Sequence, residues 1–81
     1  MQLNTTSDYV IRTVMHLAMH PDRCCSANEI EQQMGVPAQY LHKVTAKLKK
    51  AGLLQTVQGN GGGYRLCSAP ESISLYDILS L

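Results

Sequence analysis

The sequence predicts a mainly α-helical domain with a small β-hairpin, arranged as a winged helix-turn-helix. Apolar residues recur at helical spacing in three segments joined by short turns. Two short apolar segments then flank a glycine-rich tip, which is typical of a hairpin. The middle of the chain also carries lysines and an arginine but no acidic residue between Glu31 and Glu71.

Length and composition fit one domain that spans residues 1–81. The chain has 81 residues, of which 44% are hydrophobic, so it can close one small core and is not predicted to be disordered. Its formal net charge is only +1, so the distribution of charge is more informative than its sum. A locally basic surface is typical of contact with nucleic-acid phosphates, and a solvated basic face is the alternative.

The opening segment is expected to be the first helix, which ends at Pro21. Ser7 or a neighbouring threonine is expected to cap it, and Asp8 complements the positive start of the helix. The predicted apolar face consists of Val10, Val14, Leu17 and Ala18.

The second helix is predicted over residues 27–34. Ser26 and Glu29 form the pattern of a capping box, and Gly35 can take the left-handed conformation that ends a helix. Ile30 and Met34 face inward at i and i+4. A short turn and Pro37 then lead into the third helix, which completes the helix-turn-helix layout.

The third helix is predicted over residues 37–51, with two contrasting faces. Its inner face consists of Leu41, Val44, Leu48 and Ala51. Its outer face consists of Gln39, His42, Lys43, Ala46 and Lys50, flanked by Lys47 and Lys49. This basic outer face is predicted to read DNA.

The chemistry of these side chains suggests separate roles. Lys43, Lys47 and Lys50 suit phosphate contacts. Gln39 and His42 suit base edges, because Gln can bond adenine and His can donate to guanine acceptors. For His42, the alternative is an exposed residue without specificity.

The hairpin is predicted from strands at residues 53–58 and 64–67 around a turn at residues 59–63. Because a two-stranded hairpin is not stable alone, it is expected to pack on the helices as a wing. A plain flexible loop is the alternative. Beyond it, Ser74 and Asp77 could cap a last apolar helix that stops after about two turns, so the natural protein is expected to continue.

The histidines and cysteines of the first helix and loop raise the question of a metal site. His16 and His20 precede Cys24 and Cys25, and these ligand types suit zinc. Adjacent cysteines are not the usual ligand spacing, however, and Cys25 can pack as a small hydrophobe. We predict no metal site here. Without a signal peptide or a membrane-length apolar run, the chain is expected to be cytoplasmic, with reduced thiols and no membrane contact.

Several motifs together resemble the N-terminal domain of Rrf2-type transcription regulators. They are MQLNTTSDY at the start, EI in the second helix, YLHKV and LKKAGLL in the third helix and beyond, GNGGGYRL in the wing, and ISLYDIL near the end. The resemblance covers essentially the whole chain. It implies a repressor-like regulator that binds a palindromic double-stranded operator as a homodimer.

The resemblance also implies which residues meet DNA, with the third helix in the major groove and the wing at the minor groove. Many members carry Arg where this chain has Gln58, so a weaker wing contact is implied. Together with the lysines above, the predicted DNA contacts are Gln39, His42, Lys43, Lys47, Lys50, Gln58, Asn60, Tyr64 and Arg65.

For cofactors, the resemblance implies none in this chain. Family members that hold an iron–sulfur cluster use three cysteines in a loop that would lie beyond the last residue of this chain. The long dimerisation helix of the family is also not found in this sequence. Some nitric-oxide sensors use an acidic residue where Asp8 stands, so Asp8 could bind a cluster in a full-length form. An ordinary charge at the start of a helix is the alternative for Asp8.

No arrangement of residues suggests catalysis. The wing glycines follow a strand but open no helix, so they do not fit a dinucleotide-binding motif. The protein is therefore expected not to be an enzyme. The alternative from a different class is a winged helix that binds another protein, and the basic, acid-free middle favours DNA over it.

Overall fold

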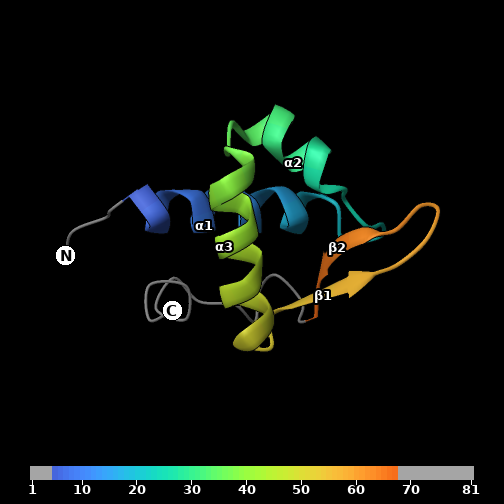
Figure 1. Ribbon diagram of the computed structural model, residues 1–81. Helices are drawn as coiled ribbons and strands as arrows, with labels where there is room; N and C mark the ends of the chain where they lie inside the picture. The colour runs from blue at the N-terminus through green and yellow to red at the C-terminus, as the bar shows by residue number, and fades with distance from the viewer. Residues whose placement is uncertain (1–4, 68–81) are drawn as a thin grey trace.

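The computed structural model describes residues 5–67 and shows three helices followed by an antiparallel hairpin (Figure 1). The elements are α1 at Thr5–Met19, α2 at Ala27–Met34, α3 at Ala38–Lys50, β1 at Leu54–Val57 and β2 at Gly63–Leu66. In Figure 1, α3 crosses in front of α1, and α2 lies above both. The predicted winged helix-turn-helix is confirmed.

The core lies where the three helices meet the hairpin. Its buried members are Val10, Val14, Leu17, Cys25, Ile30, Val36, Leu41, Val44, Leu48 and Leu54. They include most of the apolar faces predicted for α1 and α3. Ala18 is partly buried at the edge of its face. The assignment of Ala51 to the inner face was wrong, because α3 ends at Lys50 and Ala51 is its exposed C-cap.

Helix α1 differs from the prediction at both ends. Thr5 already begins the helix, so neither Ser7 nor its neighbouring threonines precede it as a cap, and that prediction was wrong. The helix ends at Met19, ahead of Pro21. Asp8 lies in the first turn, as expected, and its carboxylate pairs with the Arg12 guanidinium at 3.2 Å.

Helix α2 has the predicted bounds, because its end signals are local. The Ser26 hydroxyl accepts a hydrogen bond from the backbone N–H of Glu29 at 3.1 Å, and Gly35 ends the helix at φ 67°. The reciprocal half of the predicted capping box is replaced, since the Glu29 carboxylate binds Arg23 and His16 instead. Tertiary partners therefore outcompete the local cap for this carboxylate.

Removing the Ser26 cap should destabilise the domain modestly. We expect Ser26→Ala to lower the free energy of unfolding by about 1 kcal/mol, the usual effect of losing a serine N-cap. Urea denaturation would measure this. Asn28→Ala is the matched control, because Asn28 is an exposed residue of the same turn and is not the N-cap. Equal losses in the two variants would contradict the capping role.

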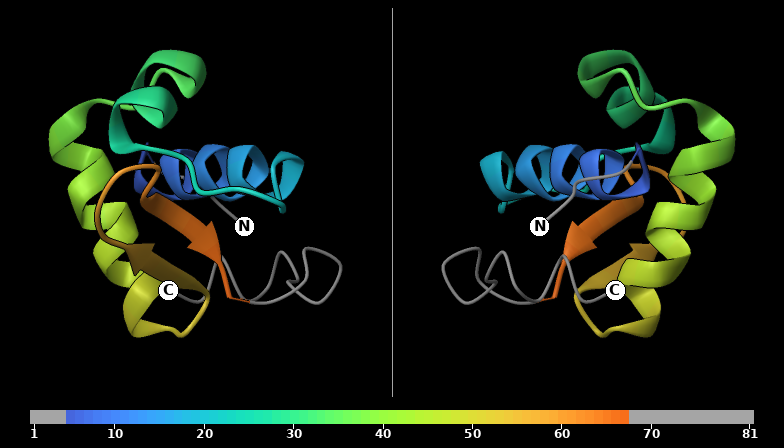
Figure 2. Two further views of the ribbon diagram at one scale, coloured as in Figure 1. Left: turned by 90° about the vertical axis from the view of Figure 1, so that its right-hand side faces the viewer. Right: turned by 90° about the vertical axis from the view of Figure 1, so that its left-hand side faces the viewer.

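The hairpin is attached to the helices by more than side-chain packing. Its register pairs Leu54 with Leu66 and Thr56 with Tyr64. The loop residue Cys25 then forms an antiparallel bridge to Tyr64, with both N–H to O distances at 2.8 Å. Figure 2 shows the hairpin lying beneath α1 and beside α3. The bridge attaches β2 to the helical part of the domain. The alternative of a plain flexible loop is therefore excluded for the residues of β2.

The last helix predicted from Ser74 onward lies outside residues 5–67. Within those residues, no helix combines the length and apolar character that a membrane span needs.

Candidate nucleic-acid interface

The exposed face of α3 carries the predicted reading residues. Gln39, Lys43 and Lys50 project from the side opposite the buried Leu41 and Leu48, as helical periodicity requires. Lys47 is also exposed, and the same periodicity puts it on the flank away from His42. The Lys43 ammonium lies 5.7 Å from the centre of the Tyr40 ring, a cation–π contact that restrains this lysine.

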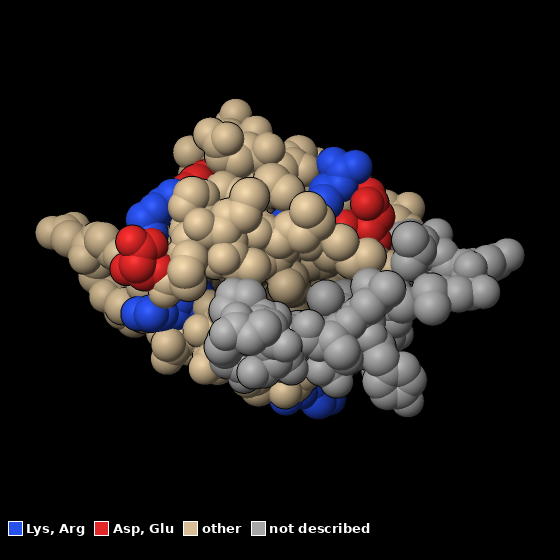
Figure 3. Space-filling model, turned by 180° about the vertical axis from the view of Figure 1, so that it is seen from behind, with Lys and Arg blue, Asp and Glu red and all other residues tan. Residues whose placement is uncertain are grey.

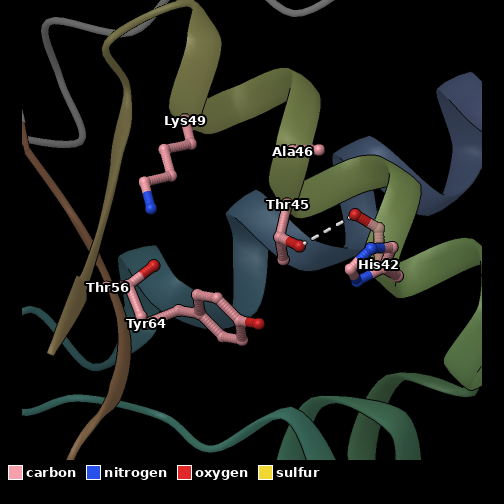
Figure 4. A pocket seen from close by; sticks show the side chains of 6 residues that line it. All are labelled: His42, Thr45, Ala46, Lys49, Thr56 and Tyr64. Atoms are coloured by element: carbon pink, nitrogen blue, oxygen red, sulfur yellow. Dashed lines mark hydrogen bonds between the residues drawn. The ribbon is translucent and has the colours of Figure 1, made fainter. Parts of the chain in front are cut away.

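A hollow of about 220 Å³ separates α3 from the hairpin (Figure 4). Its lining residues are His42, Thr45, Ala46, Lys49, Thr56 and Tyr64. In Figure 4, the Lys49 ammonium points from α3 towards the hairpin, and the Tyr64 ring reaches back below Thr45. Lys49 was not among the predicted DNA contacts. Helical spacing places it on the same flank as His42, but only the packing of the hairpin makes that flank the wall of a hollow.

Strand register explains why the hairpin presents Thr56 and Tyr64 to this hollow. The two residues are cross-strand partners, so their side chains project from the same face of the hairpin. The backbone of Tyr64 is held by its bridge to Cys25. Thr45 is buried, and its hydroxyl donates to the His42 carbonyl at 3.1 Å. The hollow is therefore lined by polar groups on a well-supported backbone.

The other wing residues occupy two different environments. Gln58 and Asn60 are exposed at the tip. Arg65 is half-buried and projects from the opposite face of the hairpin to Tyr64, because neighbouring residues alternate along a strand. Its guanidinium donates to the Pro21 carbonyl at 3.2 Å. The structure thus brings Tyr64, but not Arg65, together with the residues of α3.

Charge is distributed differently on the opposite side of the molecule. Seen from behind, the described residues in view are mainly uncharged, and the acidic side chains among them lie beside basic ones (Figure 3). Helix α3 contains lysines but no acidic residue. Among the three helices, α3 is therefore the one with basic side chains and no acidic residue.

A second polar cluster lies between α1 and α2, away from this face. The Glu29 carboxylate is 2.6 Å from His16 Nε2 and accepts hydrogen bonds from Arg23 at 2.8 and 2.9 Å. The contacts with Arg23 and His16 lower the pKa of Glu29 to about 2. Burial raises the pKa of the neighbouring Cys25 thiol to about 11. The sequence pattern suggested His16 and Cys25 as ligand types, but Glu29 was expected only as a capping residue.

The helices, the wing and the basic face of α3 define a winged helix-turn-helix domain of the transcription-regulator class. A family model described as Rrf2, an iron-dependent transcriptional regulator, matches residues 3–81. The chain therefore belongs to the Rrf2 family of transcriptional regulators.

Individual relatives agree with this assignment. The regulator NsrR of Halalkalibacterium halodurans is 38% identical over 76 residues, which cover 93% of this chain and 52% of that protein. IscR of Aliivibrio salmonicida is 32% identical over 81 residues, covering 99% of this chain and 48% of that protein. The chain thus spans about half the length of these curated relatives.

Solved structures show the same fold. IscR of T. potens superimposes with a TM-score of 0.93 at 32% identity, covering 99% of this chain and 59% of that one. CymR, the global cysteine regulator of B. subtilis, superimposes with a TM-score of 0.90 at 30% identity, covering 98% of this chain and 62% of that one.

Residues 5–67 do not fit an iron–sulfur cluster. Such clusters are held chiefly by several cysteine thiolates. In this part of the chain, the group of potential metal ligands consists of His16, Cys25 and Glu29, and it contains a single thiol. Asp8 lies apart from it, paired with Arg12.

Proposed function

We propose that this chain is a sequence-specific DNA-binding domain of a transcription regulator, with a binding rather than a catalytic role. The observation that carries the proposal is the hollow between α3 and the wing, which adjoins a helix face with lysines and no acidic residue. A helix and a wing joined by such a hollow suit a DNA backbone that passes between two grooves. The alternative of a protein-binding module has no comparable support.

Each exposed side chain has a role in this proposal. Helix α3 enters the major groove, where Gln39 and His42 meet base edges. Lys43, Lys47 and Lys50 contact phosphates, and the hollow adds Lys49 and the Tyr64 hydroxyl to them. Gln58 and Asn60 approach the minor groove from the wing tip. Arg65 remains a candidate phosphate contact, because its hydrogen bond to the Pro21 carbonyl uses only part of the guanidinium's donor capacity.

The same proposal extends to the whole protein. Residues 1–81 form one DNA-binding domain, and the full-length regulator acts as a homodimer on a palindromic operator. Two linked half-sites would raise the affinity well above that of one domain. Contact with the chromosome requires a cytoplasmic location. An iron–sulfur cluster, with Asp8 as one ligand, belongs to a full-length form only.

Titration with DNA tests the proposal directly. We expect the chain to bind duplex DNA at low salt and to lose affinity steeply as salt rises, because lysine–phosphate contacts release counterions. Fluorescence anisotropy at two salt concentrations measures this. The proposal would be contradicted if the chain did not bind at low salt, or if its affinity did not change with salt concentration.

Base reading by Gln39 needs a separate measurement. Selection of bound sequences from a random duplex pool should yield a preferred half-site. Gln39→Ala should then relax the preference at one base position, with a loss of about 1–3 kcal/mol on the preferred site. Lys47→Gln is the comparison, since a phosphate contact should weaken all sequences alike. An unchanged preference in Gln39→Ala would remove Gln39 from the reading residues.

A further inference from the structure

Three potential metal ligands from separate elements converge behind the wing. His16 comes from α1, Cys25 from the loop before α2, and Glu29 from α2. One ligand atom from each lies within 4.8 Å of the other two. His16 is 4% exposed and Cys25 is fully buried, so two of the three groups are fixed in the protein interior.

We propose that His16, Cys25 and Glu29 form a binding site for Zn²⁺. Imidazole nitrogen, thiolate sulfur and carboxylate oxygen are the three ligand types that zinc takes in proteins. Ligand distances of about 2.0–2.3 Å would place the ligand atoms of a tetrahedral site roughly 3.3–3.8 Å apart. His16 Nε2 and Glu29 Oε2 are now 2.6 Å apart, in hydrogen-bond contact, and no pair in the group exceeds 4.8 Å. Zinc would separate the first pair and draw the thiol in, which rotation of the partly exposed Glu29 side chain can accommodate.

The charges around the cluster favour a cation. The Glu29 carboxylate and a Cys25 thiolate would supply two negative charges, which match a divalent ion. Arg23 now supplies the positive charge, through a bidentate contact with Glu29. Because the Arg23 side chain is 47% exposed, it can turn into solvent when zinc takes its place. The coordination position left open would face the space that Arg23 vacates, where water can bind.

Burial of Cys25 distinguishes this cluster from a simple ion network. A His–Glu–Arg network needs no thiol, yet the Cys25 sulfur lies within 4.8 Å of the ligand atoms of both His16 and Glu29. Its sulfur is also the softest ligand in the group, which favours zinc over magnesium or calcium. The His20 ring lies against the His16 ring in a tilted arrangement, with centres 4.8 Å apart and an interplanar angle of 57°, and so restrains the orientation of that imidazole.

The location of the site connects it to the wing. Cys25 exchanges two backbone hydrogen bonds of 2.8 Å with Tyr64, whose side chain lines the hollow beside α3. Zinc bound at Cys25 would therefore tie α1, α2 and β2 together at one point. An effect of bound zinc on how the wing meets DNA rests on the proposed function, whereas the metal site itself does not.

Metal titration of the full chain tests the site. After treatment with a chelator and its removal, we expect the chain to bind one Zn²⁺ by calorimetry. Co²⁺ as a spectroscopic probe should give a thiolate-to-cobalt charge-transfer band. Cys25→Ser should remove that band and weaken Zn²⁺ binding by at least tenfold. Cys67→Ser is the matched control, because Cys67 is exposed and lies outside the cluster, and it should bind as the unmodified chain does.

Arg23→Gln separates a metal site from a merely structural network. It removes the side chain that competes for Glu29, so Zn²⁺ should bind severalfold more tightly than to the unmodified chain. A structural network alone would give a less stable protein with no gain in metal affinity. Absence of stoichiometric Zn²⁺ binding, or binding that survives Cys25→Ser unchanged, would overturn the site. Neither result bears on the DNA titration.

Discussion

Gly63→Ala is expected to lower the free energy of unfolding by about 2–4 kcal/mol, because it combines backbone strain with a steric clash. Gly63 has a φ of +143°, which alanine rarely adopts. A Cβ at this position would lie 2.4 Å from the Cys25 carbonyl oxygen and 3.0 Å from the Ser26 nitrogen. Both contacts are with backbone, so relief requires movement of the wing or of the loop before α2. The bridge between Cys25 and Tyr64 should be lost first.

Gly61→Ala is the matched control for this prediction. Gly61 also has a positive φ, of 75°, but a Cβ there would have nothing within 4 Å. We expect it to cost only about 1 kcal/mol, the penalty of the left-handed conformation alone. Chemical denaturation gives both values, and hydrogen exchange at the Tyr64 amide reports on the bridge. Equal losses in the two variants would show that the wing is not held by the Cys25 contact.

Removing two lysines from the outer face of α3 should give the largest effect on DNA affinity. We expect the double variant Lys43→Gln and Lys50→Gln to bind duplex DNA at least tenfold more weakly at low salt, with the slope of log K against log salt reduced by about 2. Both residues are exposed, so the folded domain should lose little stability beyond the cation–π contact of Lys43 with Tyr40. Anisotropy over a range of salt concentrations measures affinity and slope together.

The control for the lysine variants is Arg12→Gln. It removes one positive charge from α1, where Arg12 already pairs with Asp8, so local charge is compensated before the change. It should leave the salt slope unchanged, although losing the hydrogen bond to the Met34 carbonyl could lower stability slightly. A salt slope that falls equally in Arg12→Gln and in Lys50→Gln would mean that net charge, rather than the α3 face, determines binding.

Most of the fold could be predicted because its signals are local. Ser26 and Gly35 mark the two ends of α2 within a few residues of each other, and the predicted bounds match the observed Ala27–Met34. The recurrence of apolar residues every three or four positions determined which side of α3 is buried, at Leu41, Val44 and Leu48. The glycine-rich tip located the hairpin to within a residue or two. Short-range backbone chemistry was sufficient for each of these.

The composition of the candidate interface could be predicted only in part. The outer face of α3 follows from helical periodicity, so its exposed lysines were identified correctly as exposed. Lys49 was missed as a lining residue because the hollow exists only where the hairpin lies beside α3. The sequence also did not predict that Arg65, whose contact with DNA stays a prediction, would donate a hydrogen bond to the Pro21 carbonyl. Which flank of a helix faces the wing depends on how the helix and the hairpin pack in the tertiary structure.

The sequence by itself determined the three helices, the hairpin, the basic face of α3 and, through its motifs, the Rrf2 family. Only the tertiary structure decided the partners of polar groups that are distant along the chain. The Glu29 carboxylate binds His16 and Arg23 instead of capping α2, and the Cys25 backbone hydrogen-bonds to Tyr64 in the wing. The physical reason is that helix ends and faces depend on near neighbours. Buried polar groups instead take whichever partners the packing of separate elements brings within hydrogen-bonding distance.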